Sequence, residues 1–174
     1  MATTMKLIAQ TTLGSSASNI EFTNIPATPY ADLLLVCSLR DTATASGIAR
    51  EQAFFTFNGS STGYSGRWLF GAGTSTVSSG TSGTSSFDAW RISSANATSS
   101  TFTSVMFYIP NYAGSTNKSF SMEAAAENNS SSDWILSAGA GLWSNTAAIT
   151  SVKVAPTQNF AANSSAFLYG ITKA

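Results

Sequence analysis

Apolar and polar side chains alternate with a period of two along most of this chain. Val105, Phe107 and Ile109 occupy every second position of one segment, and Phe120 and Met122 do the same in another. Side chains of a β-strand point alternately to the two faces of a sheet, so this period is typical of a strand with one buried face. A helical period of 3.6 is hard to find anywhere. The pattern therefore predicts an all-β protein.

Turn-forming residues separate the alternating segments, as at Asn58-Gly59, Pro110-Asn111 and Asn128-Asn129. We predict about ten antiparallel strands, at roughly 5–13, 18–24, 31–40, 51–58, 67–70, 87–93, 102–109, 118–127, 134–143 with 147–154, and 165–172. The segment 31–39 is nearly all apolar, which is typical of a strand buried on both faces or in a sandwich core. About ten strands fit a jelly-roll-like β-sandwich better than a seven-stranded immunoglobulin sandwich.

One stretch departs from the alternation. Residues 71–86 read GAGTSTVSSGTSGTSS and consist almost entirely of Gly, Ser and Thr. We interpret them as a flexible surface loop, with an exposed contact loop at one end of the sandwich as the alternative. The sequence shows no domain boundary and no repeat of fixed period. Its length fits a single β-sandwich domain over 1–174, in which 1–14 form an N-terminal anchoring strand.

The residues needed for most catalysis are missing. The 174 residues include no histidine, which excludes Ser-His-Asp, Cys-His and histidine-based zinc sites within one chain. Cys37, the single cysteine, lies in an apolar segment and is expected to be a buried, inert thiol. Glu123 and Glu127 share a strand face but lie about 13 Å apart, beyond the roughly 5–10 Å of a glycosidase carboxylate pair. We expect no enzyme, no catalytic residue and no cofactor.

Oxygen ligands for a cation are densest at Asn128, Asn129 and Asp133. Their spacing is not that of an EF-hand, so a polar turn without a metal ion is the favoured interpretation.

Charge limits the partners. Eight basic and eight acidic residues give a net charge of zero, so the chain has no basic surface for nucleic acid. The apolar segment 33–37 is far too short to span a bilayer, and no cationic amphipathic stretch marks a membrane surface. The N-terminus lacks a signal-peptide pattern, which favours assembly in the cytoplasm. Weak repulsion between copies favours a homo-oligomer.

The aromatic residues are the remaining candidates for binding: Trp68, Trp90, Trp134, Trp143, Tyr30, Tyr64, Tyr108 and Tyr112. Packing in the core is the favoured interpretation, and an outer face that stacks on sugars or contacts a protein is the alternative. Arg67 is adjacent to Trp68, and Arg91 to Trp90. If these pairs lie in strands, each has an inward ring and an outward cation.

Five segments together resemble short β-rich virion proteins of tailed phages, especially those that infect marine cyanobacteria. They are IEFTNIPATPYADLLLVCSLR (20–40), FTFNGSSTGYSGRWLFGAG (55–73), FYIPNYAGSTNKSFS (107–121), GLWSNTAAITSVKV (141–154) and SSAFLYGITKA (164–174). The resemblance extends over most of the chain and includes no catalytic motif. Where the family pattern reads IPATYTDL, this chain has an added Pro29, which we expect to alter a turn and leave the fold unchanged.

The resemblance implies a structural component of the virion, assembled in the host cytoplasm. A single small β domain without fibre repeats favours a capsid decoration (cement) protein that contacts the major capsid protein. We expect a homotrimer, because symmetric capsid sites favour closed rings. The alternative is a tail-fibre or receptor-binding module that recognises host surface polysaccharide. A glycan hydrolase is the third hypothesis, and it requires two carboxylates at catalytic distance in a cleft.

Overall fold

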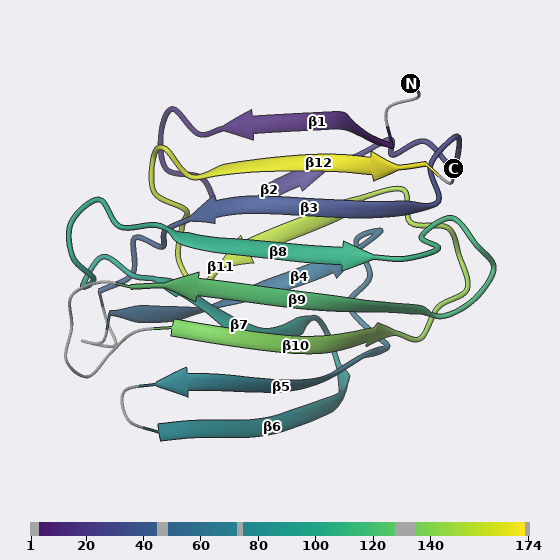
Figure 1. Cartoon of the computed structure of the whole chain (residues 1–174). Helices are drawn as coiled ribbons and strands as arrows, with labels where there is room; N and C mark the ends of the chain where they lie inside the picture. The colour runs from purple at the N-terminus through teal and green to yellow at the C-terminus, as the bar shows by residue number, and fades with distance from the viewer. Residues whose placement is uncertain (1–3, 45–48, 73–74, 128–134, 173–174) are drawn as a thin grey trace.

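The computed structural model describes residues 4–44, 49–72, 75–127 and 135–172, and the described part contains twelve strands in two facing sheets (Figure 1). The large sheet has the order β1 (Met5–Thr12), β12 (Ser165–Ile171), β3 (Asp32–Leu39), β8 (Thr103–Ile109), β9 (Lys118–Ala126), β10 (Ile135–Trp143), β5 (Tyr64–Ala72) and β6 (Ser75–Thr84). The small sheet has the order β2 (Ile20–Phe22), β11 (Val152–Pro156), β4 (Arg50–Phe57) and β7 (Phe87–Ser93). All neighbouring strands are antiparallel, so the predicted all-β sandwich is confirmed.

Eight of the strands have the connectivity of a jelly roll. The first of these strands in the sequence, β1, pairs with the last, β12. Moving inward along the sequence, β2 pairs with β11, β3 with β8, and β4 with β7. This nested order arises when one long antiparallel ribbon folds over into two facing sheets. The remaining strands form two inserted hairpins, β5–β6 and β9–β10, which both join the large sheet beyond β8. The large sheet is therefore twice as wide as the small one.

The strand predictions need two corrections. Residues 71–86 were expected to form a flexible loop, and this is wrong, because 75–84 form β6 and pair with β5. Nearly all of β6 is exposed, so no apolar alternation marks it, and backbone hydrogen bonds to β5 hold it in place. The segments 134–143 and 147–154 were grouped as one strand region. Residues 135–143 form β10, whereas only 152–154 of the second segment belong to a strand, β11, which lies in the other sheet.

No α-helix occurs in the described ranges, and accordingly none of them holds a helix that could cross a membrane.

Aromatic rings fill the space between the sheets. Phe55 of the small sheet stacks on Phe107 of the large sheet, with ring centroids 4.1 Å apart. Phe120 meets Phe57 edge-on at 5.4 Å and Phe87 edge-on at 5.0 Å. These rings belong to one continuous hydrophobic cluster that includes residues of both sheets. The inward-facing residues of the strands form this cluster. Because side chains alternate along a strand, the residues between them face outward.

The strand β3 shows what this arrangement does to an apolar segment. Leu33, Leu35, Cys37 and Leu39 are buried, whereas the side chains between them are only partly buried. Of the two interpretations of this segment, the sandwich-core strand is therefore the one that the structure shows. Leu34 and Val36 are directed to the outer face of the large sheet, away from the small sheet.

Candidate functional site

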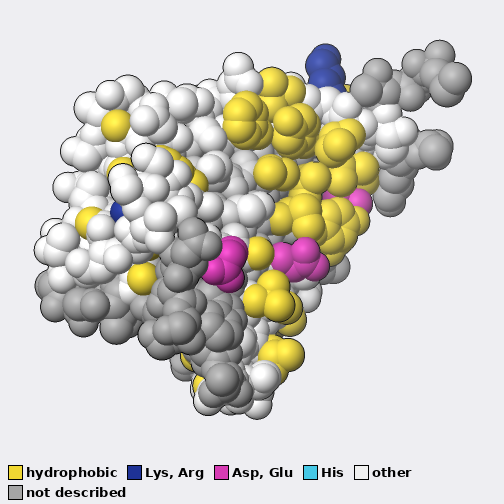
Figure 2. Space-filling model, turned by 60° about the vertical axis from the view of Figure 1, so that its left-hand side comes forward, with side chains coloured by type: hydrophobic (Ala, Val, Ile, Leu, Met, Phe, Trp, Pro, Cys, Tyr) yellow, Lys and Arg dark blue, Asp and Glu magenta, His cyan; other side chains and the backbone are white. Residues whose placement is uncertain are grey.

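The outer face of the large sheet carries two rows of apolar side chains that cross several strands. The strand register places Leu7, Tyr169, Leu34 and Tyr108 in one row, and Phe167, Val36 and Met106 in the next. Met5 and Ile171 lie beside the first row, and Leu69 and Leu136 lie on the inserted strands. We call these eleven residues the outer apolar face. Figure 2 shows hydrophobic side chains gathered in a patch on this side of the molecule, with few acidic side chains among them.

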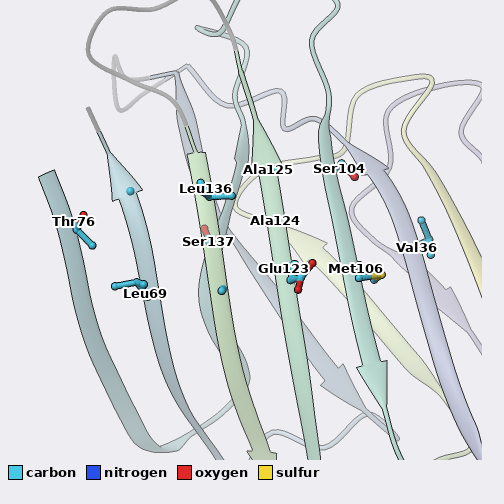
Figure 3. Close-up of a pocket in the computed structure, with 12 residues that line it drawn as sticks. Val36, Leu69, Thr76, Ser104, Met106, Glu123, Ala124, Ala125, Leu136 and Ser137 are labelled. Atoms are coloured by element: carbon cyan, nitrogen blue, oxygen red, sulfur yellow. The ribbon is translucent and has the colours of Figure 1, made fainter. Parts of the chain in front are cut away.

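A hollow of about 550 Å³ lies within this face (Figure 3). The bulkier side chains around it are Val36, Leu69, Met106, Glu123 and Leu136. The strand register places the short side chains of Ala125 and Ala138 between them, on β9 and β10. The hollow therefore arises because small residues on the central strands are flanked by large residues on both sides.

Leu136 is the most exposed large apolar residue of the described chain, at 64% of its full accessibility. Met5, Leu7 and Leu69 are each more than 40% exposed. Single exposed apolar residues are ordinary, but a contiguous set of this kind marks an interaction surface.

The outer apolar face carries little charge. Glu123 is the single charged side chain among the described residues that line the hollow, and it is exposed. Tyr108 is the last residue of the first row. Its hydroxyl donates a 2.8 Å hydrogen bond to Oδ2 of Asp32, which raises the pKa of this tyrosine. The backbone N–H of Asn111 donates to Oδ1 of the same carboxylate at 2.9 Å. A polar margin thus borders an apolar surface.

Most of the candidate aromatic residues belong to the core. Trp90, Trp143, Tyr64 and Tyr112 are each at most 2% exposed, which confirms the favoured interpretation for these four. Tyr64 hydrogen-bonds through its hydroxyl to the backbone N–H of Phe57 at 2.8 Å, so its polar atom has a partner inside the core.

The other aromatic candidates are divided. Trp68 packs partly against the core while the neighbouring Arg67 is exposed, so the predicted inward ring and outward cation are confirmed for this pair. Tyr30 is half-buried, and Tyr108 lies on the outer apolar face with 38% of its side chain accessible. Trp134 lies outside the described residues.

The structure places the thiol in the core and does not bring the two glutamates noted in the sequence to a common hollow. Cys37 is 3% exposed, and burial raises the pKa of its thiol strongly, which confirms the expected inert cysteine. Glu123 lies on the hollow, whereas Glu127 follows the end of β9 and does not line it. The described ranges contain no group of three residues able to hold a metal ion. Asn128, Asn129 and Asp133 lie outside them.

The outer apolar face was not recognised as a site from the sequence, although two local signals point to it. The apolar segment 31–39 has hydrophobic side chains at the positions that face away from the core. In β8, Met106 and Tyr108 do the same between the buried Val105, Phe107 and Ile109. Strands with apolar residues on both faces thus indicate where a second apolar surface lies.

Comparisons with known proteins identify no family. No protein-family model matches the chain, and no curated protein matches it. Among solved structures, the fructofuranosidase from Schwanniomyces occidentalis complexed with fructose aligns with 99% of this chain at 7% identity and a TM-score of 0.30. The chain spans 35% of the length of that protein. The CBM2 module of the evolved Dit of Lactobacillus casei BL23 phage J-1 aligns with 90% of this chain and 69% of its own, at 9% identity and a TM-score of 0.18. At these TM-scores neither likeness bears on function.

Proposed function

We propose that this protein is a structural component on the outer surface of a tailed-phage particle. In this role it is a capsid decoration protein that binds the major capsid protein through the outer apolar face and stabilises the head. The protein is assembled in the host cytoplasm and catalyses no reaction. The resemblance of its segments to phage virion proteins supports a place on the particle. The outer apolar face is the observation that supports the proposed binding role.

The outer side of the large sheet is wide enough for a stable protein contact. Its eight strands, spaced about 4.8 Å apart with about seven residues each at 3.3 Å, cover about 900 Å², and the outer apolar face lies on six of them. A standard protein interface buries about 800 Å² of each partner. The rigid aromatic core behind the sheet holds the face in shape, which limits the entropy lost on binding.

The chemistry of the face also constrains the partner. Leu69, Leu136 and Met106 require an apolar surface, whereas aliphatic side chains offer a sugar few stacking platforms. Glu123 would become buried in such a contact and needs a cation opposite it, because an unpaired buried carboxylate is costly. We therefore expect an apolar partner surface with an arginine or lysine facing Glu123.

The first test is the number of copies in purified particles. A decoration protein is expected in numbers comparable to the capsid lattice sites, as measured by quantitative mass spectrometry against the major capsid protein. A few copies per particle would rule out the decoration role.

The second test changes the face directly. Leu136→Lys introduces a charge at the rim of the hollow, and we expect its affinity for particles that lack this protein to fall at least tenfold, or about 1.4 kcal/mol. Because Leu136 is largely exposed, the thermal unfolding midpoint should change little. Thr23→Lys is the matched control, since Thr23 is exposed and follows β2 of the opposite sheet. Equal binding by the two variants would exclude this face as the contact.

A tail-fibre or receptor-binding module that recognises host polysaccharide is the second candidate. Tyr108 favours it, because this aromatic ring is accessible on the outer apolar face beside the acidic Asp32. A glycan array with the intact protein distinguishes the two functions. Binding that is lost in Tyr108→Ala and retained in Leu136→Lys would favour the receptor-binding role.

A further inference from the structure

The two sheets have four edges, and three of them are protected against pairing with another strand. The edge strand β2 is only three residues long. The edge strand β7 has a bulge against β4 and carries Asp88 and Arg91. The edge strand β1 has a bulge between Leu7 and Ala9 and carries Lys6. Short length, bulges and charged residues are the devices that proteins use to prevent edge-to-edge association.

The fourth edge strand, β6, has almost none of these devices. Its ten residues, STVSSGTSGT, include no charged residue and no proline. Its register with β5 is continuous from the pair Ser65–Ser82 to the pair Ala72–Ser75 and shifts only at the Tyr64 end. None of the described residues forms a strand on its other side. Roughly every second residue of β6 therefore presents its backbone N–H and C=O groups outward along this edge.

We propose that β6 pairs with the β6 strand of a second copy of this protein, in the antiparallel direction. The pairing makes one continuous sheet from the two large sheets, related by a two-fold axis perpendicular to the sheet. Where the two strands overlap, it satisfies the outward backbone groups of both, and serine and threonine side chains can hydrogen-bond across the new pair.

A second copy fits this edge better than an unrelated strand. Self-pairing needs only a strand with small, uncharged side chains, and β6 provides these over its whole length. Recognition of a foreign strand depends on pockets for its alternate side chains. To the two hollows beside it β6 contributes only serine, threonine and glycine, and the larger lining residues, such as Trp68 and Leu69, lie on strands behind this edge. The net charge of zero removes long-range repulsion between the copies.

Arg67 restricts the register of the pair. On the outer face its guanidinium group covers Gly80, where an added Cβ would come within 2.6 Å of three side-chain atoms of Arg67. If Gly80 lay at the two-fold axis, the guanidinium groups of the two copies would face each other. Like charges opposite one another destabilise a strand pair. The axis is therefore expected nearer to the Ser75 end, around Thr76 to Ser78.

Both copies then present their outer apolar faces on the same side of the joined sheet. This dimer is a separate inference from the proposed capsid binding, because it uses an edge and not the face. It also differs from the homotrimer expected from the sequence, so the mass of the assembly separates the two.

Sedimentation equilibrium of the full chain over a concentration series tests the pairing. We expect a species of two chains, and we expect Ser78→Lys to raise the dimer dissociation constant at least tenfold. Thr23→Lys should leave it unchanged, and the unfolding midpoints of both variants should stay near that of the unaltered protein. A monomer at all concentrations, a three-chain species, or a dimer that is insensitive to Ser78→Lys would overturn the proposal.

Cysteine scanning locates the axis. The buried Cys37 does not react, so single cysteines at positions 76 to 81 supply the accessible thiol of each variant. Residues that face themselves across the axis bring their Cβ atoms to disulfide distance, about 3.5–4.5 Å. Among the single-cysteine variants, we expect oxidative cross-linking to be greatest within the range from Thr76→Cys to Ser78→Cys. We expect none in Thr23→Cys. Uniform cross-linking along β6, or as much in Thr23→Cys, would contradict β6 pairing.

Discussion

Individual glycines determine how the aromatic core fits beneath the large sheet. Gly139 and Gly141 take inward positions on β10, between the short Ser137 and the large Trp143. A Cβ added at Gly141 would lie 2.1 Å from Cζ of Phe120, and one added at Gly139 would lie 3.3 Å from Cζ of Phe87. The ring of Phe120 on the neighbouring β9 and the ring of Phe87 on β7 of the facing sheet thus occupy the space that side chains on β10 would need.

Gly141→Ala tests this dependence. We expect a loss of about 1–3 kcal/mol in the free energy of unfolding, because the ring of Phe120 must move within a packed core. Chemical denaturation measures the change. Gly71→Ala is the control, since nothing lies within 4 Å of the Cβ it would add. Adding Phe120→Leu to Gly141→Ala should cost less than the sum of the two single changes, and strict additivity would show that the two sites do not clash.

A buried side chain at the end of a strand holds one of the long connections in place. Arg40 follows β3 and is 9% exposed. Its Nη1 donates to the carbonyl oxygens of Thr98 and Thr101, at 2.9 and 2.8 Å. Its Nη2 donates to the carbonyl oxygens of Ala95 and Ala97, at 3.3 and 3.1 Å. One guanidinium group therefore fixes the connection between β7 and β8, which belong to different sheets.

Arg40→Met should lower the free energy of unfolding by about 2–4 kcal/mol, because several carbonyl groups lose a charged donor. Hydrogen exchange of the amides in 95–101 should become faster, while that of the core strands changes less. Arg67→Met is the control, since Arg67 is exposed and its one described hydrogen bond is to the adjacent Gly66. Equal effects of the two changes would argue against a specific role of Arg40.

The whole molecule has few groups that titrate near neutral pH. It has no histidine, and burial raises the pKa of the Cys37 thiol and raises the pKa of Tyr64 to about 12. A raised pKa in the folded state means that the group stabilises the protein below its unfolded pKa and that this contribution is lost as the pH rises. Stability should therefore vary little from about pH 6.5 to 8 and respond to alkaline pH first through Cys37, whose unfolded pKa is about 8.5.

Cys37→Ala isolates this contribution. The difference in unfolding free energy between the unaltered protein and the variant should be constant below about pH 8. Above about pH 8.5 it should change by up to about 1.4 kcal/mol per pH unit, in the direction that weakens the unaltered protein. Urea denaturation at a series of pH values measures it. A difference that stays constant up to pH 10 would show that the thiol is ionised in the folded protein.

The sequence predicted the strands with an inner apolar face well. The expected segment 87–93 coincides with β7, and 118–127 differs from β9 by one residue. The sandwich class followed from the number of such segments. The strand β6 was missed because nearly all of it faces solvent, so its residues carry no hydrophobic signal. Its place in the sheet depends on hydrogen bonds to β5.

Alternation in the amino-acid sequence is enough to identify the core residues of strands such as β8 and β9, because the period of two is a local property of a half-buried strand. The absence of histidine likewise excludes any catalytic or metal-binding role of that residue type. The outer apolar face can be recognised only in three dimensions, because its rows combine residues as distant in sequence as Leu7 and Tyr169. Pairing between remote strands sets their register, and no local pattern records which strands become neighbours. For the same reason, β6 can be identified as the least protected edge only when the order of the strands in both sheets is known.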